Sequence, residues 1–135
     1  MSPRVVASSH GGYLVEASNG SSSITMDLPK QDGGEGKSPS PEETVLAALG
    51  GCTAMTLRMY ATRKGWPLEG VEVTLTYEKL APGAPPEAKP AIATEIKLLG
   101  PLDAAQKAKL MEIAQKCPVY RMLLSDLVIP EALVG

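Results

Sequence analysis

The feature that most constrains the fold is an uncharged run of fourteen residues, 44–57, which reads TVLAALGGCTAMTL. A strong helix start precedes it, because Ser40 suits the N-cap, Pro41 suits the first helical position, and Glu43 is placed to close a capping box. The helix should end near Gly65. A helix without charge on any face is expected to be buried on nearly every side, and this run is too short to span a bilayer. The sequence therefore predicts a long central core helix.

Strand-like patterns with a period of two lie on both sides of this helix. They cover residues 4–9, 13–18 and 22–28 before the helix, and 71–77 and 92–98 after it. Asn19-Gly20 tolerates the positive φ of a tight hairpin turn. The connectors 30–40 and 79–90 have no periodicity and are expected to be irregular, the first of them flexible. The sequence thus predicts an N-terminal antiparallel meander and two further strands.

Two helices are predicted near the C-terminus. Asp103 is the N-cap of a helix that runs to about Lys116 and carries one apolar face. Pro118 can begin a second, short helix that ends at Leu124, and residues 127–129 are expected to form a last strand. The order of elements gives an α+β fold.

Composition excludes several classes of protein. The 135 residues include 13 Lys and Arg against 15 Asp and Glu, for a net charge of -2, which does not suit binding to nucleic acid or to an anionic membrane. A hydrophobic content of 44% and a charged content of 21% are typical of one globular domain, residues 1–135. With four Tyr, one Trp and no Phe, the core must use smaller side chains, which favours further burial through dimerisation.

The compartment bears on how the cysteines are interpreted. The sequence shows neither a signal-peptide core nor an apolar run of membrane-spanning length, so a cytoplasmic protein is expected. Two cysteines in that reducing environment indicate free thiols or a reversible redox pair rather than a structural disulfide. With one His and no CxxC or HxxxH spacing, no metal site is expected.

Cys52 lies inside the uncharged helix, directly after Gly50-Gly51. Each glycine in a helix interior costs about 1 kcal/mol relative to alanine, which indicates close approach of another backbone or a ligand, or simple helix packing. Because Cys52 is mid-helix, the helix dipole does not stabilise its thiolate; Thr56 can offer a hydroxyl, whereas Arg58 points to a different face. A buried cysteine can equally be an inert hydrophobe.

Cys117 has a different setting. As the residue before Pro118 it is the predicted N-cap of the next helix, where free backbone N–H groups lower the pKa of a thiol. A thiol of low pKa suits a resolving or leaving-group role. The alternative is a core contact on the apolar face of the preceding helix.

Two segments carry a family resemblance. Residues 38–54, SPSPEETVLAALGGCTA, and residues 116–119, KCPV, resemble the OsmC/Ohr family of osmotically induced and organic hydroperoxide resistance proteins. The resemblance implies an intertwined α+β homodimer and a thiol peroxidase. In it, Cys52 would attack organic hydroperoxides or hydrogen peroxide to give a sulfenic acid, and Cys117 would resolve that acid into a disulfide. No bound cofactor is implied; the reductant would be an external dithiol such as dihydrolipoamide.

The family pattern also uses a glutamate and an arginine to orient the thiolate and the peroxide. Glu42 matches the glutamate, but ten residues of helix separate it from Cys52 by about 15 Å, so it would have to come from the partner chain. Otherwise it is a first-turn partner of the helix dipole. The arginine falls near Gly11, in Ser-His-Gly-Gly, where none is present; His10 and Arg58 are the candidates to replace it, although His10 also fits a solvated loop residue.

Two other functions remain open at this point. In one, the chain is an OsmC-like protein that binds a small electrophile or an apolar ligand and has weak or no peroxidase activity. In the other, both cysteines only fill the core.

Overall fold

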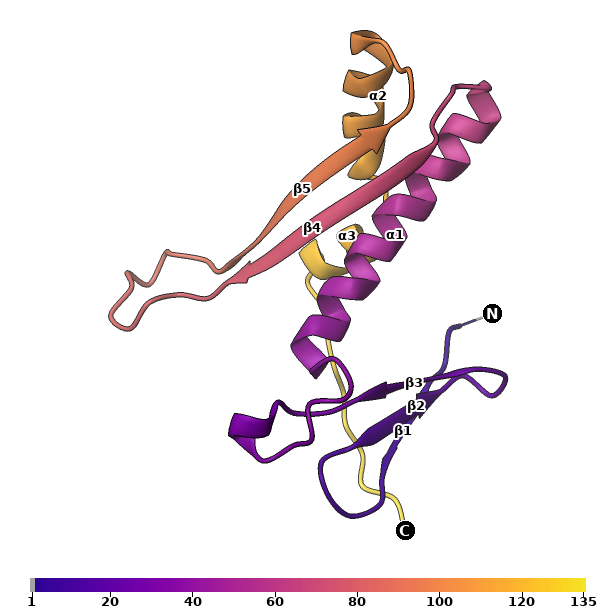
Figure 1. Ribbon diagram of the computed structural model, residues 1–135. Coiled ribbons are helices and arrows are strands. Elements are labelled where there is room, and N and C mark those ends of the chain that lie inside the picture. The colour runs from indigo at the N-terminus through magenta and orange to yellow at the C-terminus, as the bar shows by residue number, and fades with distance from the viewer. Residues whose placement is uncertain (1) are drawn as a thin grey trace. The chain divides into compact units, whose positions relative to one another are not determined.

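The computed structural model describes residues 2–135, which divide into two compact units. The first ends at Ala47 and the second begins at Ala48. The long helix α1 (Pro41–Lys64) starts in the first unit and continues in the second (Figure 1). Among the residues that the structure describes, no helix has both the length and the hydrophobicity needed to cross a bilayer.

The N-terminal unit contains the predicted meander. Strands β1 (Val6–Ser9), β2 (Val15–Ser18) and β3 (Ser23–Met26) pair antiparallel in the order β1-β2-β3. The side chain of Asn19 accepts hydrogen bonds from the backbone of the two serines that follow Gly20, and Gly20 has a φ of 100°. The hairpin turn therefore forms as the sequence predicts. Each strand is shorter than the stretch of alternating sequence that predicts it.

Helix α1 begins at the predicted capping box. The Ser40 hydroxyl accepts the Glu43 N–H at 3.2 Å, and the Glu43 carboxylate accepts the Ser40 N–H at 2.9 Å. These two bonds satisfy backbone donors that the first turn of a helix leaves without intrahelical partners. The helix ends at Lys64, directly before Gly65, whose φ is 69°.

The second unit is a hairpin covered by helices. Strands β4 (Gly70–Glu78) and β5 (Ala91–Leu99) pair antiparallel along their whole length, and residues 79–90 form an excursion with turns. In Figure 1 the hairpin runs alongside α1, and α2 follows the end of β5. The buried core of this unit joins α1, α2 and the segments next to the hairpin; it contains Leu57, Ala61, Leu68, Leu102, Leu110, Ile113 and Ala114.

Helices α2 (Ala104–Ala114) and α3 (Pro118–Leu124) close the second unit. A capping box joins Asp103 and Gln106 at the start of α2. The predicted strand at residues 127–129 is wrong: this segment pairs with no strand of residues 2–135, and Val128 is 87% exposed. An apolar stretch becomes a strand only where a sheet edge accepts its backbone hydrogen bonds.

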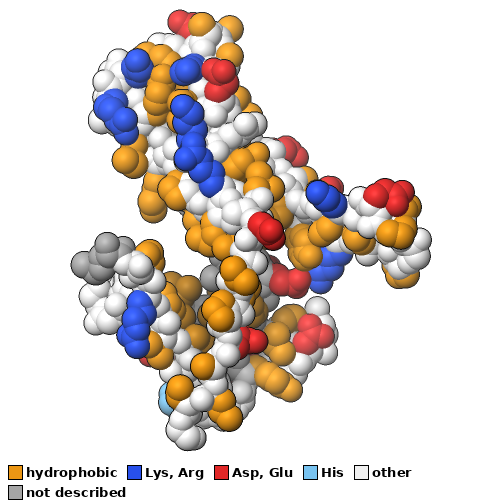
Figure 2. Space-filling view, turned by 180° about the vertical axis from the view of Figure 1, so that it is seen from behind, with side chains coloured by type: hydrophobic (Ala, Val, Ile, Leu, Met, Phe, Trp, Pro, Cys, Tyr) orange, Lys and Arg blue, Asp and Glu red, His pale blue; other side chains and the backbone are white. Residues whose placement is uncertain are grey.

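The prediction that α1 is buried on nearly every side is also wrong for a single chain. The buried residues of α1 are Leu49, Gly50, Thr53, Leu57 and Ala61, most of them four positions apart and so on one face. Other apolar residues of the helix are exposed, Met55 by 69%. Figure 2 shows hydrophobic side chains at the surface of the molecule. One hairpin and two short helices cover only one face of α1.

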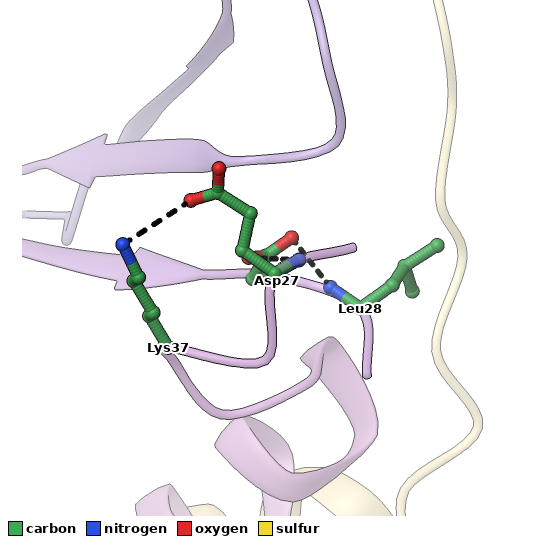
Figure 3. A network of polar contacts seen from close by, with 4 residues as sticks. Asp27, Leu28 and Lys37 are labelled. Carbon is green, nitrogen blue, oxygen red and sulfur yellow. Dashed lines mark hydrogen bonds and ion pairs between the residues drawn. The ribbon is translucent and has the colours of Figure 1, made fainter. Parts of the chain in front are cut away.

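The connector between β3 and α1 is more ordered than its sequence predicts. Asp27 is buried, and its two carboxylate oxygens accept the N–H groups of Leu28 at 2.8 Å and Glu35 at 3.1 Å (Figure 3). The Glu35 side chain in turn pairs with Lys37. A short 3-10 helix, η1 (Lys30–Asp32), lies within the loop. The connector is therefore not irregular throughout, because one buried carboxylate satisfies two backbone donors seven residues apart.

Candidate active site

The structure brings the two cysteines close together. Cys52 lies on α1 and Cys117 is the N-cap of α3, and the two side chains are near enough for each to shift the pKa of the other. Both are free thiols. The residues between them fold into the hairpin and α2, so tertiary packing rather than sequence spacing creates the pair.

Cys117 is the better stabilised thiolate of the pair. Its side chain is fully buried, and this desolvation alone would raise its pKa. The Tyr120 N–H donates to its sulfur at 3.4 Å, and the Cys52 side chain, the backbone of Val119 and the Thr53 side chain also favour the thiolate. Together these groups outweigh desolvation and lower the pKa of Cys117 below the 9.0 of an unperturbed thiol. The predicted N-cap position and lowered pKa of Cys117 are confirmed.

Cys52 holds the proton of the pair. It is half-buried, and its desolvation raises the pKa of its thiol above 9.0, as does the neighbouring Cys117 side chain. The backbone of Val119 and the side chain of Thr56 act in the opposite direction but do not compensate. In the reduced single chain the Cys117 thiol therefore loses its proton at a lower pH than the Cys52 thiol.

The glycines before Cys52 have different surroundings. A Cβ added to Gly50 would lie 2.7 Å from Cδ1 of Leu75 and 3.8 Å from Cβ of Val73, so Gly50 permits α1 to approach β4 closely. A Cβ at Gly51 would meet no atom within 4 Å. Gly50 thus serves the close approach of α1 to a strand of the hairpin rather than packing against another helix.

The remaining predicted site residues are Glu42, His10 and Arg58. Glu42, in the first turn of α1, and His10, after β1, are exposed residues of the N-terminal unit, whereas both cysteines belong to the second unit. The Arg58 guanidinium donates to the backbone carbonyl of Leu68.

Sequence analysis missed two residues that touch the pair, Thr53 and Tyr120. Thr53 falls in the row of buried residues with Leu49 and Leu57, one turn away on either side. A hydroxyl within an otherwise apolar row is the signal that could have identified it. The backbone N–H of Tyr120 reaches the Cys117 sulfur because it is the third residue of α3, the usual donor to an N-cap side chain.

Two apolar pockets lie beside this site. One of about 340 Å³ is enclosed by the hairpin, α1 and α3, and one of about 180 Å³ lies nearer to α2. Leu49, Thr94 and Tyr120 line both, and Thr53 lines the smaller one. Residues 2–135 hold no cluster of three or more His, Cys, Asp or Glu side chains that could bind a metal ion.

A sequence model described as OsmC-like protein matches residues 34–130. The chain belongs to the OsmC-like protein family. The matched segment contains both cysteines and Glu42, so the site just described lies within the family's shared region. No curated protein matches this OsmC-like chain.

Solved structures agree with this assignment. An OsmC-like protein of Mycoplasma pneumoniae is 16% identical and superposes with a TM-score of 0.75, covering 93% of this chain and 89% of that one. An organic hydroperoxide resistance protein of Legionella pneumophila is 25% identical, with a TM-score of 0.66 and coverages of 91% and 90%. One from Bacillus subtilis is 15% identical, with a TM-score of 0.62 and 93% of each chain covered. The OsmC/Ohr fold thus extends over nearly the whole chain.

The opposite pKa shifts predict how the reduced OsmC-like protein titrates. Thiolate absorbance near 240 nm should rise in two steps, the first below pH 9.0 from Cys117 and the second above it from Cys52. Cys117→Ser should abolish the early step. Cys52→Ala should shift the early step to higher pH. The Cys52 side chain lowers the pKa of Cys117, and this variant removes that effect. A single step near pH 9 that both variants leave unchanged would contradict this arrangement.

Proposed function

We propose that this protein is a thiol-dependent peroxidase that reduces organic hydroperoxides or hydrogen peroxide. The observation that carries the proposal is the proximity of the Cys52 and Cys117 side chains, each of which shifts the pKa of the other. Two thiols in contact can exchange a proton and can close a disulfide with little movement of the backbone. Membership of the OsmC-like family and the name of the Legionella relative support the same chemistry.

Cys52 is the thiol that meets the peroxide, because it is half-buried while Cys117 is fully buried. Its proton first passes to Cys117. The Cys52 thiolate then attacks the outer oxygen of the hydroperoxide, an S–O bond forms, and the O–O bond breaks. Sulfur supplies two electrons, and the alkoxide takes a proton to leave as an alcohol, or as water if the substrate is hydrogen peroxide.

Cys117 then resolves the sulfenic acid. Once Cys117 has given its proton to the departing alkoxide, its thiolate attacks the Cys52 sulfur, the S–S bond forms, and the S–O bond breaks with loss of hydroxide, which takes a proton from solvent to give water. The hydrogen-bond donors around Cys117 favour the thiolate that this step needs. An external dithiol such as dihydrolipoamide returns both cysteines to thiols by two exchanges, and is itself oxidised to a cyclic disulfide.

The proposed enzyme is a homodimer of a reducing, cytoplasmic compartment. Apolar side chains exposed in the single chain support a second copy: Met55 and Met59 on α1, and Leu127, Val128 and Ile129 after α3. Glu42 of the partner subunit would orient the Cys52 thiolate and the peroxide, with His10 or Arg58 as candidates for the donor that an arginine supplies in the family pattern. A hydrogen-bond donor beside Cys52 would stabilise the Cys52 thiolate and so favour transfer of the Cys52 proton to Cys117.

A second candidate function is binding of a small apolar or electrophilic ligand. The apolar pocket of about 340 Å³ beside Tyr120 and the raised pKa of Cys52, which leaves this thiol mostly protonated, favour it. In that case Cys52→Ser would leave ligand binding intact and abolish only incidental peroxide consumption.

Steady-state consumption of cumene hydroperoxide tests the proposed function. We expect turnover with dihydrolipoamide as the reductant and much slower turnover with the monothiol glutathione, because a dithiol resolves its own mixed disulfide with the protein. Hydrogen peroxide should be measured in parallel to compare the two substrate classes. No consumption above the protein-free rate with either reductant would contradict the peroxidase and leave the ligand-binding function.

A further inference from the structure

Asp27 is a buried carboxylate in the loop that leads from β3 to the first turn of α1. It directly follows Met26, the last residue of β3, and is 3% exposed. Its two oxygens accept the N–H groups of Leu28 and Glu35 (Figure 3). Its own N–H donates to the Pro39 carbonyl at 3.1 Å. Because burying a carboxylate is costly unless its oxygens are hydrogen-bonded, this network is a specific one.

Other contacts close the same loop. The Thr25 and Ser38 hydroxyl oxygens lie 2.7 Å apart and share a hydrogen bond. A Cβ at Gly34 would overlap the Leu28 carbonyl oxygen and lie 2.7 Å from Oδ1 of Asp27, so this position admits no side chain. The end of β3 is thus tied to residues 38 and 39, and the middle of the loop packs against its start.

The far end of this loop carries a residue of the proposed active site. Pro39 directly precedes Ser40, the N-cap of α1, and Glu42 lies in the first turn of that helix. All of these residues belong to the N-terminal unit. Since Asp27 holds Pro39 through its N–H and holds the loop through its carboxylate, it fixes where Glu42 stands relative to the meander.

We propose that Asp27 is a positioning residue for Glu42. This inference rests on the proposed function, in which Glu42 orients the thiolate and the peroxide at Cys52 of the partner subunit. Asp27 does not touch the substrate; it acts by holding the loop that ends at the first turn of α1. Loss of one of its hydrogen bonds lets that turn shift, and a misplacement of about 1 Å can slow an oriented reaction about a hundredfold.

Single-turnover oxidation of Cys52 tests this role. The reduced protein is mixed with one equivalent of cumene hydroperoxide, the Cys52 sulfenic acid is trapped with dimedone at successive times, and the disulfide is quantified after acid quench. Asp27→Asn keeps the shape and one acceptor oxygen but turns an amide NH₂ towards a backbone N–H. We expect Cys52 oxidation about tenfold slower and disulfide closure within about twofold of the wild-type rate, because Glu42 acts in the first step.

Glu42→Gln completes a double-mutant cycle with Asp27→Asn. Alone, it should slow Cys52 oxidation by about tenfold or more. Adding Asp27→Asn to it should change the rate by less than about twofold, because the residue that Asp27 positions no longer acts. A merely structural role of Asp27 would instead slow the reaction equally in both backgrounds.

Two further variants make the result specific. Asp32→Asn removes an exposed carboxylate from the same loop, and it should leave Cys52 oxidation at the wild-type rate. Gly34→Ala changes no charge but forces the loop away from Leu28, so it should slow Cys52 oxidation as Asp27→Asn does.

Three results would overturn the inference. They are wild-type oxidation of Cys52 in Asp27→Asn, equal slowing with and without Glu42→Gln, and an Asp27→Asn protein that urea unfolding shows to be unfolded in water. A wild-type protein that forms neither the sulfenic acid nor the disulfide would instead refute the proposed function itself. A wild-type protein that forms both and is slowed by Glu42→Gln, with Asp27→Asn unaffected, would refute only the role of Asp27.

Discussion

Replacing Cys52 with serine should lower peroxide consumption by roughly a thousandfold or more, to the protein-free rate. A serine hydroxyl has no significant anionic fraction near neutral pH and is a far weaker nucleophile towards peroxide oxygen than a thiolate. The buried Cys117 alone should not replace Cys52, since it is not accessible to the substrate. The measurement is steady-state consumption of cumene hydroperoxide with dihydrolipoamide.

Cys117→Ser is the matched control for that variant. It should still consume one equivalent of peroxide and stop at a Cys52 sulfenic acid, which dimedone labels. Its steady-state rate should fall less than that of Cys52→Ser, because an external thiol can reduce the sulfenic acid directly. Two results would show that the two roles are misassigned. One is a Cys52→Ser protein that retains more than a tenth of wild-type turnover, and the other is a larger fall in the steady-state rate in Cys117→Ser than in Cys52→Ser.

Leu57→Ala should lower the free energy of unfolding by about 2–5 kcal/mol, the range for truncating a fully buried leucine. Leu57 has 0% exposure and belongs to the core that joins α1 to α2 and the hairpin. That core holds α1 and the start of α3 in the arrangement that brings the two thiols together. Urea unfolding of the reduced protein measures the change from the midpoint and slope.

Leu80→Ala is the control for the core variant. Leu80 lies in the excursion between β4 and β5 and is 45% exposed, so its truncation should change stability by no more than about 0.5 kcal/mol. If the two variants were destabilised equally, the excursion would be part of the cooperative core, and the placement of the core would be wrong.

Features that depend on near neighbours in sequence could be predicted. The capping boxes at Ser40 and Asp103 and the turn at Asn19-Gly20 each involve residues no more than three positions apart. Local hydrogen-bonding geometry decides these features, so sequence alone specifies them. The helix N-cap at Cys117 belongs to the same class, as does the hydrogen bond that its sulfur accepts from the Tyr120 N–H.

Features that depend on distant segments could not be predicted from composition or periodicity. The burial of α1 depends on which elements cover it, and one chain supplies cover for one face only. Residues 127–129 have the composition of a strand but no sheet edge to join. The proximity of Cys52 and Cys117 spans 65 positions, and no local pattern encodes it. The family resemblance implied the pairing of the cysteines, and the structure supplies the hydrogen bonds around them.

The most direct test of the account is the fate of the two thiols after one equivalent of cumene hydroperoxide, added to the reduced protein without a reductant. Peptide mapping by mass spectrometry under non-reducing conditions should show an intrachain Cys52–Cys117 disulfide, and one equivalent of the corresponding alcohol should form. Free thiols that persist at both positions while the peroxide remains would contradict the account, as would a disulfide that links Cys52 only to another chain.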